Sequence, residues 1–257
     1  MLWNLSSLLY YHIRAADGEI GAVSDVLFDD SSWKLRWLVV DTGNWLPGRK
    51  VLLPLNALQQ PDADARILPV NLTMKQVRDS PDIDTDMAVT RRHEAHVFDF
   101  YGLDPYWGGN LVPVSNAMAL PFIAPLAPDQ QREPDLPFPA PGEEGDPHLR
   151  SAEATNGYKI HASDGEIGHV ADFLIETEDW GIRFLKVDTG NWWPGQLVLI
   201  QPQLVQDIAW AERLISINVT RQAVKDSPPY QAGMTVDGAY EEKLAAYYNY
   251  GGGLGIV

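Results

Sequence analysis

The chain has 257 residues, of which 45% are hydrophobic, and its 35 acidic and 19 basic side chains give a formal net charge of −16. This size suits two ordinary domains, whereas the negative charge disfavours binding to the phosphates of nucleic acids or to anionic lipid surfaces. The absence of cysteine excludes disulfides and thiolate chemistry, and no apolar run approaches the roughly 20 residues that span a bilayer.

Short strands and turns are expected in the first part of the chain. Asp17-Gly18 is typical of a hairpin turn because glycine accepts positive φ, and Asn44 to Gly48 form a second turn. Strands are expected over residues 10–16, 20–28, 35–40, 50–53 and 66–70. Closure into a small barrel removes the unpaired edges that so many short strands would otherwise expose.

Two helices are expected after these strands. Thr73 and Gln76 have the spacing of a capping box, which predicts a short helix that ends at Ser80-Pro81. A longer helix is expected over residues 90–101, because aromatic and apolar residues lie on one helical face and Gly102 stops it.

The middle of the chain has a different composition. Residues 105–147 hold 10 of the 19 prolines together with several acidic residues. Such a segment is typical of an extended, semi-rigid linker.

The sequence then repeats itself at a constant offset. The pentapeptide DGEIG at 17–21 recurs at 164–168, an offset of 164 − 17 = 147, and DTGNW at 41–45 recurs at 188–192 without a gap. A second terminal helix is expected near the end of the chain, with Asp237 as its N-cap. Its apolar stripe aligns with that of the first helix at the same offset. The prediction is a mainly β protein of three parts, namely residues 1–110, a linker at 111–156, and residues 157–257.

The repeated motifs resemble those of the PRC-barrel family. The residues that carry the resemblance are DGEIGAVSDVLFDDSSWKLRWLVVDTGNWLPGRKVLLP with LTMKQVRDSPDIDTDMAV in the first copy, and DGEIGHVADFLIE, IRFLKVDTGNWWPGQLVLI and NVTRQAVKDSP in the second. The second copy departs further from the pattern, with PPYQAGM where the first has PDIDTDM.

This resemblance implies two small β-barrels in tandem, related by a pseudo-two-fold axis. Members of the family include the cytoplasmic barrel of the photosynthetic reaction-centre H subunit and one domain of a ribosome maturation factor, where the barrel docks on protein partners. The resemblance therefore implies a non-enzymatic interaction or scaffold module. An alternative, by analogy with the H subunit, is a modulator of a membrane redox complex in peripheral contact with it.

The duplicated Asp-Thr-Gly also allows a peptidase alternative. Aspartic peptidases use two carboxylates about 3 Å apart that share a proton, and Asp41 and Asp188 could supply them. The residue after the glycine in those enzymes is small, whereas this chain has asparagine followed by tryptophan. We therefore expect structural turns, in which Asp41 and Asp188 accept turn N–H groups while Gly43 and Gly190 supply positive φ.

Large apolar residues follow both turns. Trp45, Leu46, Trp192 and Trp193 are hard to bury together in a loop, which predicts an exposed patch for a protein partner, for the other barrel or for another copy of the chain.

No catalytic, cofactor-binding or metal site is expected. The acidic run at 82–86 resembles the start of a calcium loop, but it lacks the glycine and the final glutamate. The start of the chain lacks the basic region and continuous apolar run of a signal peptide, so the expected location is cytoplasmic.

Overall fold

The computed structural model describes residues 2–81, 91–103, 148–190, 196–231 and 233–250. The chain divides into two compact units, one made of Met1–Ile83 and His148–Val257 and the other of Asp84–Pro147. The first unit therefore contains the strands of both sequence repeats. The boundaries expected at 110 and 156 from the sequence stay a prediction.

Strands dominate the first repeat. Its elements are β1 (Leu2–Asn4), the 3-10 helix η1 (Leu5–Ser7), β2 (His12–Ala15), β3 (Gly18–Asp29), β4 (Lys34–Asp41), β5 (Lys50–Pro54), the 3-10 helix η2 (Leu55–Ala57), β6 (Ile67–Pro69) and helix α1 (Met74–Asp79). The five expected strands are thus confirmed to within a few residues. The capping box of α1 is confirmed as well, since the Thr73 side chain accepts from the Gln76 N–H and the Gln76 side chain accepts from the Thr73 N–H.

The second repeat follows the same order. Its elements are β7 (Leu149–Ser151), α3 (Ala152–Thr155), β8 (Lys159–Ala162), β9 (Gly165–Glu176), β10 (Gly181–Asp188), β11 (Leu197–Ile200), the 3-10 helix η3 (Pro202–Leu204), β12 (Val205–Ala209), β13 (Leu214–Ile217), α4 (Arg221–Lys225) and α5 (Gly238–Tyr250). Asp237 caps α5 as expected, because its carboxylate accepts the Tyr240 N–H at 2.9 Å.

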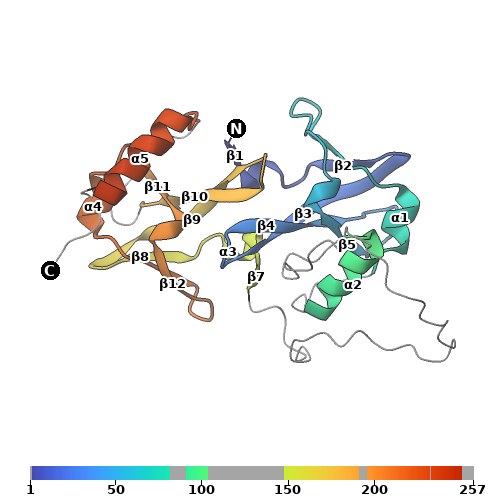
Figure 1. The fold of residues 1–257 in the computed structure, drawn as a ribbon, viewed down its shortest axis with the longest axis horizontal. Coiled ribbons are helices and arrows are strands. Elements are labelled where there is room, and N and C mark those ends of the chain that lie inside the picture. The colour runs from blue at the N-terminus through green and yellow to red at the C-terminus, as the bar shows by residue number, and fades with distance from the viewer. Residues whose placement is uncertain (1, 82–90, 104–147, 191–195, 232, 251–257) are drawn as a thin grey trace, which may run out of the picture. The chain divides into compact units, whose positions relative to one another are not determined.

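One continuous sheet holds both repeats (Figure 1). Its strand order is β12-β13-β8-β9-β10-β4-β3-β2-β6, and β4 of the first repeat pairs antiparallel with β10 of the second through Lys34 and Gly181. Two of its strand pairs, β2 with β6 and β8 with β13, are parallel. The expectation of a mainly β protein with short helices is therefore confirmed.

The strand pairings of the described residues do not close this sheet into a barrel. In the first repeat, β5 pairs only with β4 and β6 only with β2, and the chain between them makes single bridges such as that of Leu58 with Val70. Proline contributes to this, because Pro54 ends β5 and Pro69 lies in β6, and neither has an N–H to donate to a ladder. Barrel closure was predicted from the need to protect sheet edges. In the described residues, single bridges from Leu58 to Val70 and from Asp62 to Ile67 stand where a further ladder was expected.

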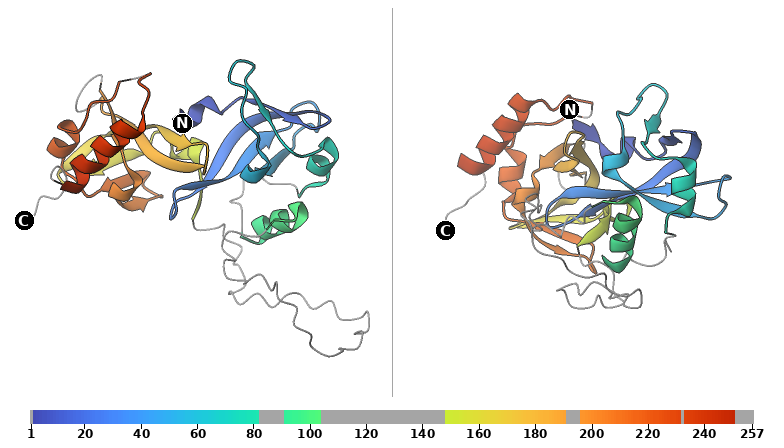
Figure 2. Two further views of the ribbon diagram at one scale, coloured as in Figure 1. Left: turned by 45° about the horizontal axis from the view of Figure 1, so that its top comes forward. Right: turned by 45° about the vertical axis from the view of Figure 1, so that its right-hand side comes forward.

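The core lies along the central strands. Trp37 and Phe28 of the first repeat and Phe173 and Phe184 of the second are among the largest fully buried side chains. Helix α1 lies beside the first repeat, and α4 and α5 lie beside the second (Figure 2).

The described part of the second unit is helix α2 (Arg91–Tyr101). Gly102 ends it in a left-handed conformation with φ of 67°, and the Leu103 N–H donates to the Phe98 carbonyl at 2.8 Å. The expected helix and its glycine stop are therefore confirmed.

Candidate interaction site at the junction of the repeats

The two Asp-Thr-Gly motifs form similar turns at the ends of β4 and β10, but their glycines differ. Gly43 has the expected left-handed φ of 53°, whereas Gly190 does not have positive φ, so the prediction for Gly190 is wrong. The second turn forms its aspartate bond without a left-handed glycine. The Asp41 carboxylate accepts the Gly43 N–H at 2.8 Å, and the Asp188 carboxylate accepts the Gly190 N–H at 2.8 Å. The buried Thr42 hydroxyl lies 2.7 Å from the carbonyl oxygens of Leu46 and Arg49, which fixes the loop after the turn. In these turns both aspartates accept a local backbone bond, as Asx turns do.

The last glycine of each DGEIG motif packs against the Asp-Thr-Gly turn of the same repeat. A Cβ atom on Gly21 would lie 2.0 Å from the Asp41 carbonyl oxygen, and one on Gly168 would lie 1.9 Å from that of Asp188. Only glycine allows the two backbones to approach this closely. The two sequence motifs are therefore parts of one structural feature.

The two aspartates lie at opposite ends of the shared sheet. Strands β4 and β10 pair at their first residues and run antiparallel, so their last residues, Asp41 and Asp188, lie in opposite directions from that bridge. Seven further residues in each strand, at about 3.3 Å per residue, separate the carboxylates by tens of ångströms. A peptidase dyad requires about 3 Å, so this geometry does not bring the pair together.

Trp45 and Leu46 are each half-buried in the loop after the first turn. The Arg78 guanidinium of α1 lies 5.7 Å from the centroid of the Trp45 ring, and Arg49 donates to the carbonyl oxygens of Arg78 and Ser80. This loop is therefore held by α1 of its own repeat. Trp192 and Trp193 lie outside the described residues, so the four-residue patch stays a prediction.

The first strand of each repeat pairs with the other repeat. Strand β1 pairs antiparallel with β9, with Leu2, Trp3 and Asn4 opposite Glu176, Ile175 and Leu174. Strand β7 pairs antiparallel with β3, with Leu149, Arg150 and Ser151 opposite Asp29, Phe28 and Leu27. Each of the six residues in the pairing of β1 with β9 lies 147 positions from its counterpart in the pairing of β7 with β3. We call β1 and β7 the arms. Each arm pairs with the opposite repeat, so the exchange of arms is reciprocal (Figure 1).

Two equivalent carboxylates hold the arms. Asp172 is buried and accepts the Ser6 N–H at 3.0 Å and the Ser6 hydroxyl at 2.6 Å. Asp25 accepts the Ser151 hydroxyl at 2.6 Å and the Glu153 N–H at 3.1 Å. Burial raises the pKa of Asp25 despite these donors, so the carboxylate is desolvated as it holds the arm.

The hairpin tips between β3 and β4 and between β9 and β10 meet at the centre of the junction. The Leu35 N–H donates to the Trp180 carbonyl at 2.9 Å, and the equivalent Ile182 N–H donates to the Trp33 carbonyl at 2.7 Å. Both tryptophans have left-handed backbones, with φ of 54° at Trp33 and 55° at Trp180. Left-handed φ is uncommon for such bulky residues and persists where the surrounding structure enforces it.

Charged groups also bind one arm to a hairpin tip. Asp30 lies 2.8 Å from His148 Nδ1 and 2.9 Å from Arg150 Nε. The Arg150 guanidinium also lies 4.1 Å from the centroid of the Trp210 ring. Strand pairing, hydrogen bonds and charge all hold the second arm in place.

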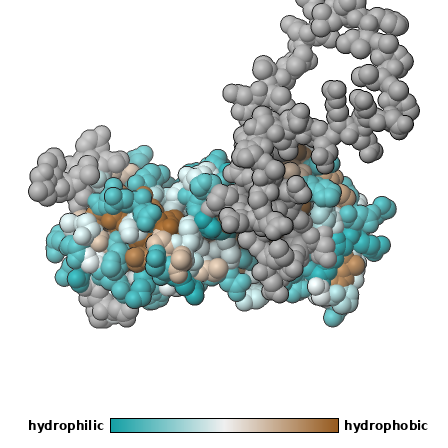
Figure 3. All heavy atoms as spheres, turned by 90° about the horizontal axis from the view of Figure 1, so that it is seen from below, coloured by the Kyte–Doolittle hydropathy of each residue, from teal (hydrophilic) through white to brown (hydrophobic). Residues whose placement is uncertain are grey.

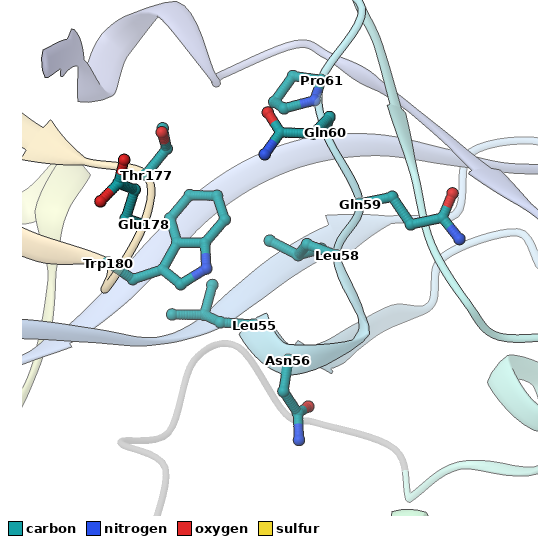
Figure 4. Close-up of a pocket in the computed structure, with 9 residues that line it drawn as sticks. All are labelled: Leu55, Asn56, Leu58, Gln59, Gln60, Pro61, Thr177, Glu178 and Trp180. Carbon is teal, nitrogen blue, oxygen red and sulfur yellow. The ribbon is translucent and has the colours of Figure 1, made fainter. Parts of the chain in front are cut away.

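A groove of about 350 Å³ opens beside this junction (Figure 4). Its first wall comes from the chain after β5 and its second from the tip between β9 and β10. The residues that line it are Leu55, Asn56, Leu58, Gln59, Gln60, Pro61, Thr177, Glu178 and Trp180. The groove thus combines apolar walls with one carboxylate and three carboxamides.

The sequence did not indicate the arms or the groove. Each arm is only three residues long, and its partner strand lies about 170 residues away for β1 and about 120 for β7. The offset of 147 residues also aligns Trp33 with Trp180, which was a usable signal, but it did not show that the two hairpin tips meet. The expected patch was placed instead at the tryptophans after the Asp-Thr-Gly turns.

Other classes of site are not seen in the described residues. These residues contain no group of three or more His, Asp or Glu side chains placed to hold a metal ion. Within the same ranges, no helix is long and apolar enough to cross a lipid bilayer. On the face seen in Figure 3, apolar side chains form small separate patches among hydrophilic ones.

Comparison with protein-family models matches residues 4–76 to the PRC-barrel domain. The match runs from the end of β1 to the capping box of α1, so it covers the strands of the first repeat. Comparison with curated proteins gave no match.

Proposed function

We propose that this protein is a non-enzymatic interaction or scaffold module built from two PRC-type barrel repeats related by a pseudo-two-fold axis. The observation that supports this proposal is the reciprocal exchange of β1 and β7 between the repeats. The first repeat carries the family match, and the second has equivalent strands at the same offset.

The exchanged arms suit a scaffold because they restrict motion between the repeats. A hinge between the repeats would have to break both arm ladders, the hydrogen bonds to Asp25 and Asp172, and the bridge between β4 and β10. A rigid surface lowers the entropic cost of binding a partner. The two repeats together then present one composite surface that neither presents alone.

A protein, either a different chain or a second copy of this one, is the partner class that we propose, and the proposed location is cytoplasmic. The net charge of −16 favours partners with basic surfaces over nucleic acid, because like charges repel along a phosphate backbone.

Affinity purification of the tagged full-length chain from its native host, after mild cross-linking, tests this function. We expect a defined protein that co-purifies, binds the purified chain directly and migrates with it in gel filtration. Parallel purification from the soluble and membrane fractions distinguishes a soluble partner from a membrane complex.

Two results would contradict the proposal. One is the absence of any directly binding protein together with a monomeric chain over the accessible concentration range. The other is cleavage of an unfolded protein substrate that Asp41→Asn abolishes, since this would show peptidase activity.

A further inference from the structure

The groove beside the junction is lined by the half-buried indole of Trp180. Trp180 lies between Thr177 and Glu178 on one side and Leu55 and Leu58 on the other, with Gln60 above it (Figure 4). The volume of the groove, about 350 Å³, is near the lower end of the range for ligand pockets, which is about 300–1,000 Å³. It therefore has room for one long side chain rather than a large cofactor.

The equivalent indole of the first repeat is packed against another ring. Trp33 stacks on Phe28 with ring centroids 5.8 Å apart and an interplanar angle of 21°. The residue equivalent to Phe28 is Ile175, because 28 + 147 = 175. Trp180 makes no aromatic ring contact within the described part of the chain. The first repeat thus covers one face of Trp33 with Phe28, whereas in the second repeat the indole of Trp180 lines the groove.

The opposite wall of the groove also differs between the repeats. In the second repeat, the segment after η3 forms β12 and pairs with β13. In the first repeat, the equivalent residues 58–62 make only the single bridges of Leu58 with Val70 and of Asp62 with Ile67. Both differences favour an open groove beside Trp180.

The charge at the groove is negative. Glu178 is exposed, and no described cation is bonded to its carboxylate, whereas the neighbouring Asp179 is paired with Arg183 at 3.0 Å. A free carboxylate beside an indole face suits a planar cation. An arginine guanidinium stacks on tryptophan and donates two parallel hydrogen bonds to a carboxylate, and the Gln60 amide oxygen could accept a further N–H.

We propose that this groove binds an arginine side chain of a protein partner, with its guanidinium stacked on Trp180 and paired with Glu178. The inference rests on the proposed interaction function, because it names the chemistry of the partner's contact.

The direct test is a titration with a short capped peptide, N-acetyl-Gly-Arg-Gly-amide, followed through the indole NMR signals of the ¹⁵N-tryptophan-labelled full-length protein. The signal lost in Trp180→Leu assigns Trp180. We expect this signal to shift on titration, with a dissociation constant on the order of millimolar for one exposed cation–π contact and ion pair. The matched peptide with citrulline, which has the same shape without the charge, should bind at least roughly tenfold more weakly.

Two charge variants make the test specific. Glu178→Gln should weaken binding of the arginine peptide roughly tenfold, because a charge-assisted hydrogen bond is lost. Glu212→Gln removes the same charge from another exposed glutamate and should leave binding unchanged. Equal binding of the arginine and citrulline peptides, or equal affinity of Glu178→Gln and the parent protein, would overturn the proposal, as would no shift at Trp180.

The outcomes also separate this inference from the proposed function. A directly binding partner that Glu178→Gln retains with unchanged affinity would leave the scaffold function in place and reject the arginine site. If the protein binds the arginine peptide specifically but has no protein partner and does not self-associate, the arginine site would stand and the scaffold function would be rejected.

Discussion

Tyr10 shows how far the two repeats have diverged at a single residue. It has a left-handed backbone with φ of 69°, and its side chain is 75% exposed. The equivalent residue of the second repeat is Gly157, with φ of 83°. The backbone N–H of each donates to a strand carbonyl of its own repeat, that of Val23 or Val170. The position therefore requires the left-handed conformation, which costs roughly 1–2 kcal/mol for residues other than glycine.

Tyr10→Gly should stabilise the protein by about 1 kcal/mol, because it removes this backbone cost and little buried contact is lost. Gly157→Ala should destabilise by about the same amount, since no atom lies within 4 Å of the added Cβ and only the backbone cost changes. Urea unfolding at equilibrium measures both. A stability loss in Tyr10→Gly would show that the exposed ring makes stabilising contacts.

At this scale, some features were predictable from the sequence and others were not. The caps at Thr73 and Asp237 were predicted because their residue types signal one conformation. The left-handed conformations of Tyr10, Trp33 and Arg66 were not, because these side chains do not favour positive φ and tertiary contacts impose it.

The hairpin between β3 and β4 depends on a buried carboxylate at its tip. Asp29 accepts the N–H groups of Ser31 and Ser32 at 3.1 and 2.7 Å, as well as both serine hydroxyls. Arg36 Nη2 lies 3.6 Å from the same carboxylate. Burial alone would raise the pKa of Asp29, but these donors and Arg36 outweigh it and lower the pKa from 3.8.

A lowered pKa in the folded state means that the ionised carboxylate stabilises the hairpin. This stabilisation is present above the unfolded-state pKa near 3.8 and is lost as pH falls through the lower folded-state pKa. The free energy of unfolding of Asp29→Asn should therefore be about 1–2 kcal/mol lower than that of the parent protein at pH 7. This difference in unfolding free energy should shrink below about pH 4. Urea unfolding between pH 7 and 3 measures this difference.

The control for this pH effect is Asp64→Asn, which changes an exposed aspartate in a loop and should alter stability little at any pH. A deficit of Asp29→Asn that stays constant from pH 7 to 3 would show that the loss comes from packing rather than from the ionised group.

At the scale of elements, hydrophobic pattern and turn chemistry predicted the long strands well. Residues 35–40 form a dense apolar run, and β4 extends only one residue beyond each end of it. Strands β1 and β7 escaped prediction because three residues carry no measurable periodicity and each pairs across the repeat boundary. Barrel closure was inferred from the need to protect edges, which does not specify how an edge is protected.

For the whole molecule, the exchanged arms connect the stability of one repeat to that of the other. Each arm contributes its pairing to a long strand of the opposite repeat, and Phe28 and Phe173 lie with ring centroids 5.6 Å apart across the junction. Unfolding one repeat therefore exposes groups that the other buries. We therefore expect the two sequence repeats to unfold as a single cooperative unit, unlike independent domains on a linker.

Asp172→Ala tests this coupling, because it leaves the Ser6 N–H and the Phe173 N–H without their carboxylate acceptor. The expected loss is about 2–3 kcal/mol, and Asp25→Ala should lose a similar amount at the equivalent arm. In both variants, native-state amide exchange should show the same free-energy loss at Val40 of the first repeat and at Ile215 of the second, while unfolding remains a single transition. If only the amides of the released arm lose protection, the arms merely fray and the repeats are stabilised separately.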